Sequence, residues 1–263
     1  MDEMKKQTGW GRCWLTVACS FIVGMVVAQD PDVPGATMTE VAKAVQQGQS
    51  EKAVELLTAL LKKDDKQSTA YYVRGREHFR LGRIKESLAD FDRHVALSPE
   101  LEPRQWERGI TMYYAKEYGR GAKQFELYQT FDNRDVENSV WRFLCMARNE
   151  GVAKAREVML PIKDDPRVPM MQVFEMFRGK VSPEQVLEAA RSGEPSPEVL
   201  AGRLFYAHLY LGLYFDATGD AEQARKYIEL AASDEAKKGR GVNTYMWDVA
   251  RVHRNQIREE AKR

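Results

Sequence analysis

Between residues 211 and 231 the chain carries small and apolar residues at fixed distances: Leu211-Gly212, Phe215, Gly219, Ala224, Ile228 and Ala231. A glycine between two apolar stretches lets the chain turn, and small residues on both sides allow two helices to cross closely. The segment therefore predicts a helical hairpin with one helix on each side of Gly219.

The same pattern recurs upstream with a period of 34 residues. Gly82 follows Gly48 at this distance, and Arg74-Gly75 returns as Arg108-Gly109. A fixed period of this length is typical of one helix pair per repeat, stacked into a solenoid. We expect an all-α fold, a right-handed superhelical solenoid of antiparallel helix pairs.

Turn and cap residues divide the repeat region, residues 37–262, into units. Thr37 and Glu40 form a capping-box pattern that opens the first helix. The expected units are about 34–67, 68–101, 102–135 and 136–169, a shortened unit at 170–204, a last unit at 205–238, and a capping helix at 242–262.

The amino-terminal segment reads as a secretory signal peptide over residues 1–28. Basic residues precede an apolar run from Trp14 to Val27, and Ala28 ends a small-residue exit suited to cleavage before Gln29. The run is too short for a membrane span of about 20 residues. We expect secretion across the inner membrane into the periplasm, with residues 29–36 as a leader. An uncleaved interfacial anchor is the alternative.

A lipid anchor is not expected, although Leu15-Thr16-Val17-Ala18-Cys19 is similar to a lipobox. Thr16 stands where a larger apolar residue is usual, and Cys19 comes too early in the apolar run. After cleavage Cys145 is the only cysteine, so the mature chain has no internal disulfide.

Charge and motifs argue against nucleic-acid binding and catalysis. Lys and Arg number 40 and Asp and Glu 39, so the chain is near neutral and gives no bulk attraction to nucleic acid. The sequence contains no phosphate-loop motif, no His-Glu-x-x-His, and only four scattered histidines. We expect no catalytic residue, no metal and no cofactor.

The repeat pattern resembles the tetratricopeptide repeat family over nearly all of the mature chain. A narrower resemblance, to the NlpI family of bacterial lipoproteins, is carried by Arg108-Gly109-Ile110, Tyr113-Tyr114, Trp141, the stretch 173–184 and the stretch 205–214. It implies a periplasmic, dimeric adaptor that brings a carboxy-terminal-processing protease to cell-wall endopeptidases. The absent lipobox is a departure from that family.

The repeat resemblance also implies which residues face the concave groove, and these combine aromatic rings with arginines. Such a wall suits an acidic or carboxy-terminal peptide. The alternative is that several of the aromatic rings, Trp141 above all, pack between adjacent repeats. The expected groove residues are Tyr72, Arg76, Arg80, Trp106, Ile110, Tyr113, Trp141, Cys145 and Arg148.

The last unit is more apolar than a solvent-facing helix needs. Tyr206, Leu209, Tyr210 and Leu213 are candidates for a homodimer or partner surface, with ordinary core packing as the alternative. Together these patterns predict a non-enzymatic protein-interaction scaffold of the cell envelope, an adaptor for a processing protease or a peptidoglycan hydrolase. The alternative function is a peptide-binding chaperone or assembly factor for secretion or pilus biogenesis.

Overall fold

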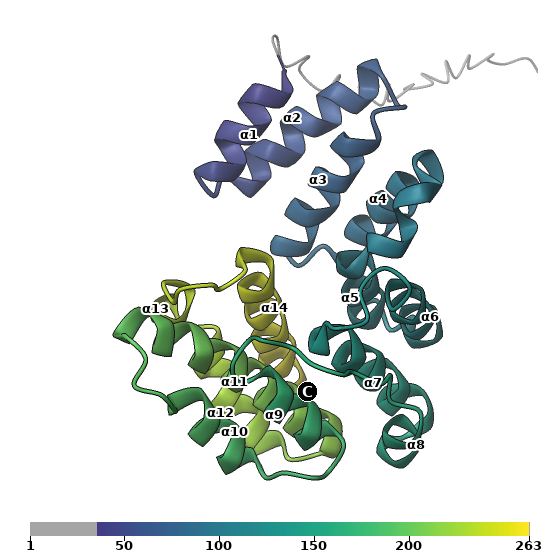
Figure 1. Ribbon diagram of the computed structural model, residues 1–263. Helices are drawn as coiled ribbons and strands as arrows, with labels where there is room; N and C mark the ends of the chain where they lie inside the picture. Colours follow the sequence, from purple (N-terminus) through teal and green to yellow (C-terminus); the bar gives the residue numbers. More distant parts are fainter. Residues whose placement is uncertain (1–35, 263) are drawn as a thin grey trace, which may run out of the picture. The chain divides into compact units, whose positions relative to one another are not determined.

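The computed structural model describes residues 36–262, all within one compact unit that spans Val33–Arg263. The expected signal peptide and nearly all of the leader lie outside these residues. Every regular element in the described part is a helix (Figure 1). None of these helices combines the length and apolar character needed to span a membrane.

The helices follow one another as antiparallel pairs, so the expected all-α solenoid is confirmed. The pairs are α1 (Met38–Gln46) with α2 (Ser50–Lys63), α3 (Ser68–Arg80) with α4 (Ile84–Leu97), α5 (Trp106–Tyr114) with α6 (Tyr118–Tyr128), α7 (Val136–Glu150) with α8 (Val152–Glu157), α9 (Met170–Phe177) with α10 (Pro183–Arg191), and α11 (Pro197–Thr218) with α12 (Ala221–Ala231). A short 3-10 helix, η1 (Pro99–Arg104), follows α4, and α13 (Asp234–Lys237) and α14 (Thr244–Glu260) end the described chain.

Local sequence explains where several helices begin and end. Thr37 and Glu40 form the expected capping box at α1, and Ser182 with Gln185 forms another at α10. Gly219 ends α11 in the left-handed conformation, at a φ of 91°, which a glycine adopts without strain.

Small residues recur because the two helices of a pair touch at their backbones. A Cβ added to Gly75 would lie 3.3 Å from the Phe91 ring, and one added to Gly212 would lie 2.5 Å from Ile228 Cγ1. Ser87 Oγ of α4 donates a hydrogen bond of 2.7 Å to the Gly75 carbonyl of α3. A hydrogen bond therefore also joins the two helices where they cross.

The last pair differs from the expected division of the chain. α11 is one continuous helix from Pro197 to Thr218, whereas the units expected from the period divide this stretch at residue 204. Ser196 and Pro197 start the helix, which continues through Gly202 and Gly212 and ends at Gly219.

The carboxy-terminal helix α14 does more than cover the last repeat. It packs on α12 and also on α3, far away in the sequence. The ring of Tyr245 on α14 stacks on Phe79 of α3 with centroids 4.8 Å apart. Arg80 Nε donates a 2.8 Å hydrogen bond to Asp248 of α14. The helix expected as a simple cap therefore joins the end of the solenoid to its second repeat (Figure 1).

The buried apolar residues form two separate clusters. The smaller consists of Ala36 and of Ala, Val and Leu side chains of α1, α2 and the start of α3, and its Leu57 is fully buried. The larger extends from Phe79 to Ala250 and includes most of the buried aromatic rings.

Candidate interaction groove

Helix α14 covers much of the surface that the repeat pattern assigns to a peptide groove. Ile110, Tyr113 and Trp141 are 0%, 4% and 1% exposed, and Cys145 is also buried. The rings of Tyr113 and Trp141 contact each other edge to face, with centroids 5.6 Å apart. In this conformation these residues belong to the core, which agrees with the alternative that they pack between repeats.

Two further residues expected in the groove, Tyr72 and Arg148, form hydrogen bonds with other residues of this chain. The Tyr72 hydroxyl donates a 2.7 Å hydrogen bond to the buried Glu107 carboxylate. Arg148 Nε donates to the Tyr113 hydroxyl at 3.3 Å, and the same guanidinium pairs with Asp216. Burial raises the pKa of Glu107, because an ionised carboxylate is poorly solvated there.

Arg80 lies at the contact between α3 and α14, where it forms ion pairs with two buried carboxylates. It bonds Asp248, as described above, and pairs with Glu77 at 3.1 Å; both acidic side chains are 2% exposed. Arg251 also donates to Asp248, at 2.9 Å. Arg80 therefore holds the fold together and has little capacity left for a ligand.

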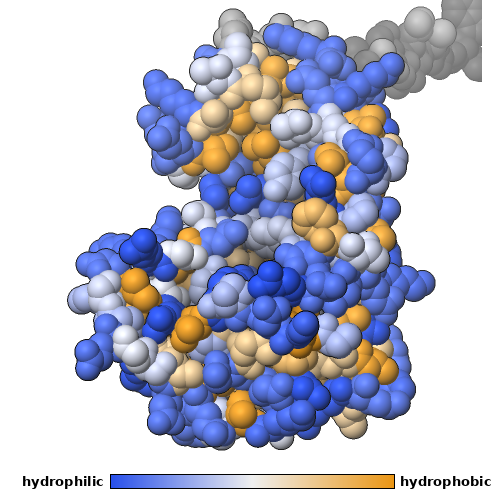
Figure 2. All heavy atoms as spheres, in the orientation of Figure 1, coloured by the Kyte–Doolittle hydropathy of each residue, from blue (hydrophilic) through white to orange (hydrophobic). Residues whose placement is uncertain are grey.

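An open groove remains at the amino-terminal end of the concave face. It has a volume of about 760 Å³ and lies between α1 and α3 on one side and α13 and α14 on the other. Figure 2 shows the surface indented on the left of the view, between the part that carries α1 and α2 and the part that carries α13 and α14. Residues from all four helices line it: Val45, Val73, Arg76, Lys237, Trp247 and Arg251, among others.

Cations stacked on aromatic rings dominate this groove. Lys237 Nζ lies 4.2 Å from the centre of the Trp247 ring, and the Arg251 guanidinium lies 5.0 Å from it. The Arg76 guanidinium stacks on Tyr245 at 5.3 Å, and its side chain is 34% exposed. Lys237 is exposed and makes no ion pair within residues 36–262. Arg76 also forms an ion pair with the buried Glu107, with Nε and Oε1 3.9 Å apart. Arg76 and Lys237 are the groove cations with the most exposed side chains, and of the two only Lys237 lacks an ion pair within residues 36–262.

Sequence reasoning found Arg76 but missed the opposite wall of the groove. Lys237, Trp247 and Arg251 lie in or beside the carboxy-terminal helix, which the sequence assigned only to capping. The spacing of four residues between Trp247 and Arg251 places both on one helical face, and this was the available signal.

Three of the four residues expected at a dimer surface lie inside the larger core, and the fourth, Tyr206, is partly buried and packs against it. Leu209, Tyr210 and Leu213 are fully buried. The Tyr206 hydroxyl donates to the Gly241 carbonyl at 3.3 Å and accepts from the Asn243 amide at 3.2 Å. These positions agree with core packing, the alternative that the sequence left open.

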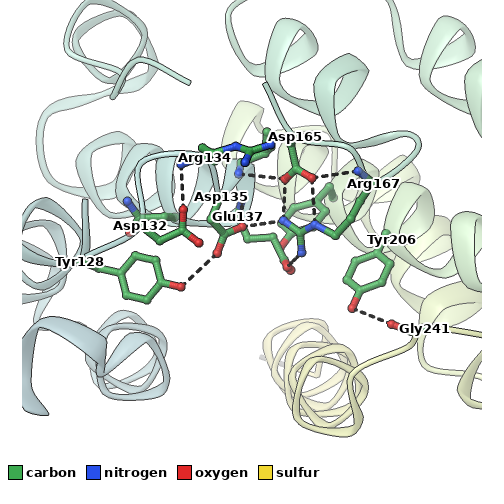
Figure 3. Close-up of polar contacts among 12 residues, drawn as sticks. Tyr128, Asp132, Arg134, Asp135, Glu137, Asp165, Arg167, Tyr206 and Gly241 are labelled. Atoms are coloured by element: carbon green, nitrogen blue, oxygen red, sulfur yellow. Dashed lines mark hydrogen bonds and ion pairs between the residues drawn. The ribbon is translucent and has the colours of Figure 1, made fainter. Parts of the chain in front are cut away.

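A second polar cluster, which sequence reasoning did not anticipate, lies at the start of α7. Figure 3 shows the Arg167 guanidinium between Asp165 and the neighbouring Asp135 and Glu137. Arg167 donates to Asp135 and Asp165 at 2.6 Å and to Glu137 at 2.5 Å. Burial and the nearby Asp135 charge raise the pKa of Glu137. Among the described residues no group of three or more His, Cys, Asp or Glu side chains could hold a metal ion.

Comparison with known proteins identifies the repeats. Residues 43–102 match the model of the tetratricopeptide repeat family. The chain is similar to the solved structure of MamA from Desulfovibrio magneticus RS-1, with 16% identity, 75% of this chain and 94% of that chain covered, and a TM-score of 0.45. It is also similar to a tetratricopeptide repeat protein from Parabacteroides merdae ATCC 43184, with 13% identity, 82% of each chain covered and a TM-score of 0.48. The match to tetratricopeptide repeats therefore covers α2, α3, α4 and parts of α1 and η1, within a chain whose helices stack in antiparallel pairs.

Proposed function

We propose that this chain is an interaction scaffold of the cell envelope that binds an acidic segment or a free carboxy terminus of a partner in the open groove. Tetratricopeptide repeats bind other proteins or peptides, which supports the general role. The single observation that carries the proposal is the accessible cationic wall formed by Arg76 and Lys237 beside Trp247. A guanidinium can bind a carboxylate through two hydrogen bonds, and an aromatic ring adds an apolar contact.

The adaptor role follows from this site together with the resemblance to the NlpI family. One partner held in the groove and another on the outer surface meet at a raised effective concentration. A carboxy-terminal-processing protease and a peptidoglycan hydrolase are the partners we propose, and the periplasm is the compartment. The groove is confined and charged, which favours a defined acidic segment over a broad range of unfolded chains.

The test compares a groove variant with a matched surface variant. Arg76→Ala/Lys237→Ala removes two groove cations, whereas Arg225→Ala/Lys123→Ala removes two exposed cations elsewhere. Each purified protein is crosslinked in envelope extract of the native host, and captured proteins are identified by mass spectrometry. Affinity for each captured partner's acidic segment is then measured by fluorescence anisotropy.

We expect the groove variant to bind at least tenfold more weakly, with unchanged helix content, and the surface variant to bind like wild type. Binding should also weaken as salt rises, because the contacts are charged. Capture of a protease or hydrolase supports the adaptor role. Capture of many unrelated unfolded proteins would support the chaperone alternative instead, and equal binding by both variants would refute the groove.

A further inference from the structure

Arg76, one of the cations that line the open groove, is also paired with a buried carboxylate. Its Nε lies 3.9 Å from Oε1 of Glu107 on α5. The Arg76 side chain is 34% exposed, whereas that of Glu107 is 5% exposed. The same guanidinium lies over the ring of Tyr72, at 5.7 Å, and over that of Tyr245, at 5.3 Å. Arg76 therefore contacts the core while it also lines the groove.

The Glu107 carboxylate has few partners for a buried acid. Its Oε1 accepts a 2.7 Å hydrogen bond from the Tyr72 hydroxyl. Among the described residues, the titratable and charged groups that act on it are Tyr72 and Arg76 of α3 and Tyr245 of α14. Burial raises the pKa of Glu107, although the Tyr72 hydrogen bond and the Arg76 charge both oppose this rise. Glu107 therefore takes up a proton at a higher pH than an exposed glutamate does.

The acidic residues that line the groove itself have a different cationic partner. Glu77 and Asp248 are both paired with Arg80. Arg76 has no ion pair within residues 36–262 other than that with Glu107. No histidine is among the described residues that line the groove. The charge of Glu107 therefore decides how strongly Arg76 is drawn toward the core.

We propose that the proton on Glu107 controls how tightly the groove binds an acidic ligand. This inference rests on the proposed function, because it concerns the same groove. When Glu107 is ionised, it competes with the ligand carboxylate for Arg76. When Glu107 is protonated, the competing charge is gone, and the guanidinium can donate two hydrogen bonds to the ligand. Glu107 is thus a positioning residue that acts on the ligand through Arg76, and binding strengthens as the pH falls.

The test measures the affinity of the intact chain for a rhodamine-labelled tetra-aspartate peptide by fluorescence anisotropy, from pH 8.5 to pH 5.5. Aspartate has an ordinary pKa of about 3.9, so the peptide stays ionised over this range. We expect wild type to bind roughly fivefold or more tightly at pH 5.5 than at pH 8.5. Glu107→Gln keeps the side-chain size and removes the charge. It should bind at pH 8.5 as tightly as wild type does at pH 5.5.

Glu188→Gln is the matched control, because Glu188 is exposed on α10 and lies outside the groove. Its pH profile should follow that of wild type. Helix content and urea midpoints of all variants are measured alongside, so that a folding defect is recognised.

Two further variants test whether Glu107 acts through its neighbours. Tyr72→Phe keeps the ring and removes the hydrogen bond that favours the ionised carboxylate, so the change in affinity should move to higher pH. Arg76→Met should bind weakly at every pH and show little pH dependence. A Tyr72→Phe profile identical to that of wild type, or a full pH dependence in Arg76→Met, would contradict the assignment.

Proton uptake on binding measures the same coupling directly. Calorimetry of peptide binding in two buffers with different ionisation enthalpies should show that wild type takes up a proton, at most about one per chain, and that Glu107→Gln takes up none. Absence of wild-type binding at every pH would overturn the proposed function together with this inference. Binding that depends on Arg76 but has the same pH profile in wild type and Glu107→Gln would overturn this inference alone.

Discussion

The two ends of the solenoid are held in different ways. Helices α1 and α2 pack mainly on each other and on α3, over a core of Ala, Val and Leu. Helix α11 packs on α7, α9, α10, α12 and α13, within the large aromatic core. The amino-terminal pair therefore behaves as one repeat stacked on its neighbour, whereas the carboxy-terminal half resembles a globular domain. The number of distant contacts, more than the repeat itself, determines how cooperatively each end unfolds.

The largest expected effect tests the closely packed carboxy-terminal half. A Cβ on Gly202 would lie 2.0 Å from the Arg240 carbonyl oxygen, and backbone cannot move aside cheaply. We expect Gly202→Ala to lower the free energy of unfolding by about 4 kcal/mol or more, measured by urea denaturation. Gly119→Ala is the control, because nothing lies within 4 Å of its added Cβ and alanine favours a helix. Equal stability of the two variants would contradict the close packing.

Two leucine truncations compare the ends directly. Leu57 and Leu211 are both fully buried, one in each cluster, so replacement by alanine should cost about 3 kcal/mol in either case. We expect Leu57→Ala to speed hydrogen exchange in α1 and α2 alone, and Leu211→Ala to speed it throughout α5–α14. The same exchange pattern in both variants would show that the chain unfolds as one unit.

The contact between α3 and α14 gives an intermediate effect. Arg80→Met leaves the buried Glu77 carboxylate without its guanidinium and removes one of two arginines from Asp248. We expect a loss of about 2 kcal/mol in thermal or urea unfolding, because an unpaired buried charge is unfavourable. Arg83→Met is the control, since its pair with Glu51 is exposed (38% and 61%) and should contribute under about 1 kcal/mol. Similar losses in both would argue against a structural role of the α3–α14 contact.

The smallest effect at neutral pH concerns His208 of α11. Burial, aided by the charges of Arg191 and Lys226, lowers the pKa of His208 to about 4. The unfolded chain, with an ordinary histidine pKa of about 6.5, then binds the proton more readily than the folded chain. The contribution of the neutral His208 to the free energy of unfolding is fully present above pH 6.5. It is lost as the pH falls toward 4, and the loss is at most about 3 kcal/mol.

His208→Gln tests this pH dependence, because it removes the titrating ring and keeps a polar side chain. Urea midpoints measured from pH 7 to pH 4 should fall less steeply for the variant than for wild type. Parallel curves would show that the ring is not protected from protonation.

Sequence reasoning predicted the features that depend on neighbouring residues. The period indicated the helix pairs, Thr37 and Glu40 indicated the first helix start, and Gly75 and Gly212 indicated the close crossings. These predictions succeed because each feature depends only on residues within one or two repeats.

Features that depend on distant contacts were not predictable in this way. The apolar face of α14 shows that it packs on something, but nothing in its spacing identifies α3 as a partner. Spacing alone therefore assigned Ile110 to the groove and left Trp141 between the groove and packing between repeats, whereas both are buried. The Asp135, Glu137 and Asp165 cluster lies outside the repeat pattern, so no period indicated it.

The closure by α14 has a consequence for how such a chain can change in evolution. Open solenoids gain and lose repeats by duplication and deletion, since each repeat contacts only its neighbours. Here Arg80 and Asp248 must meet across the intervening repeats. A duplicated or deleted unit between them would move the two partners apart. The number of repeats is therefore constrained by geometry, and divergence is left to substitutions and surface loops.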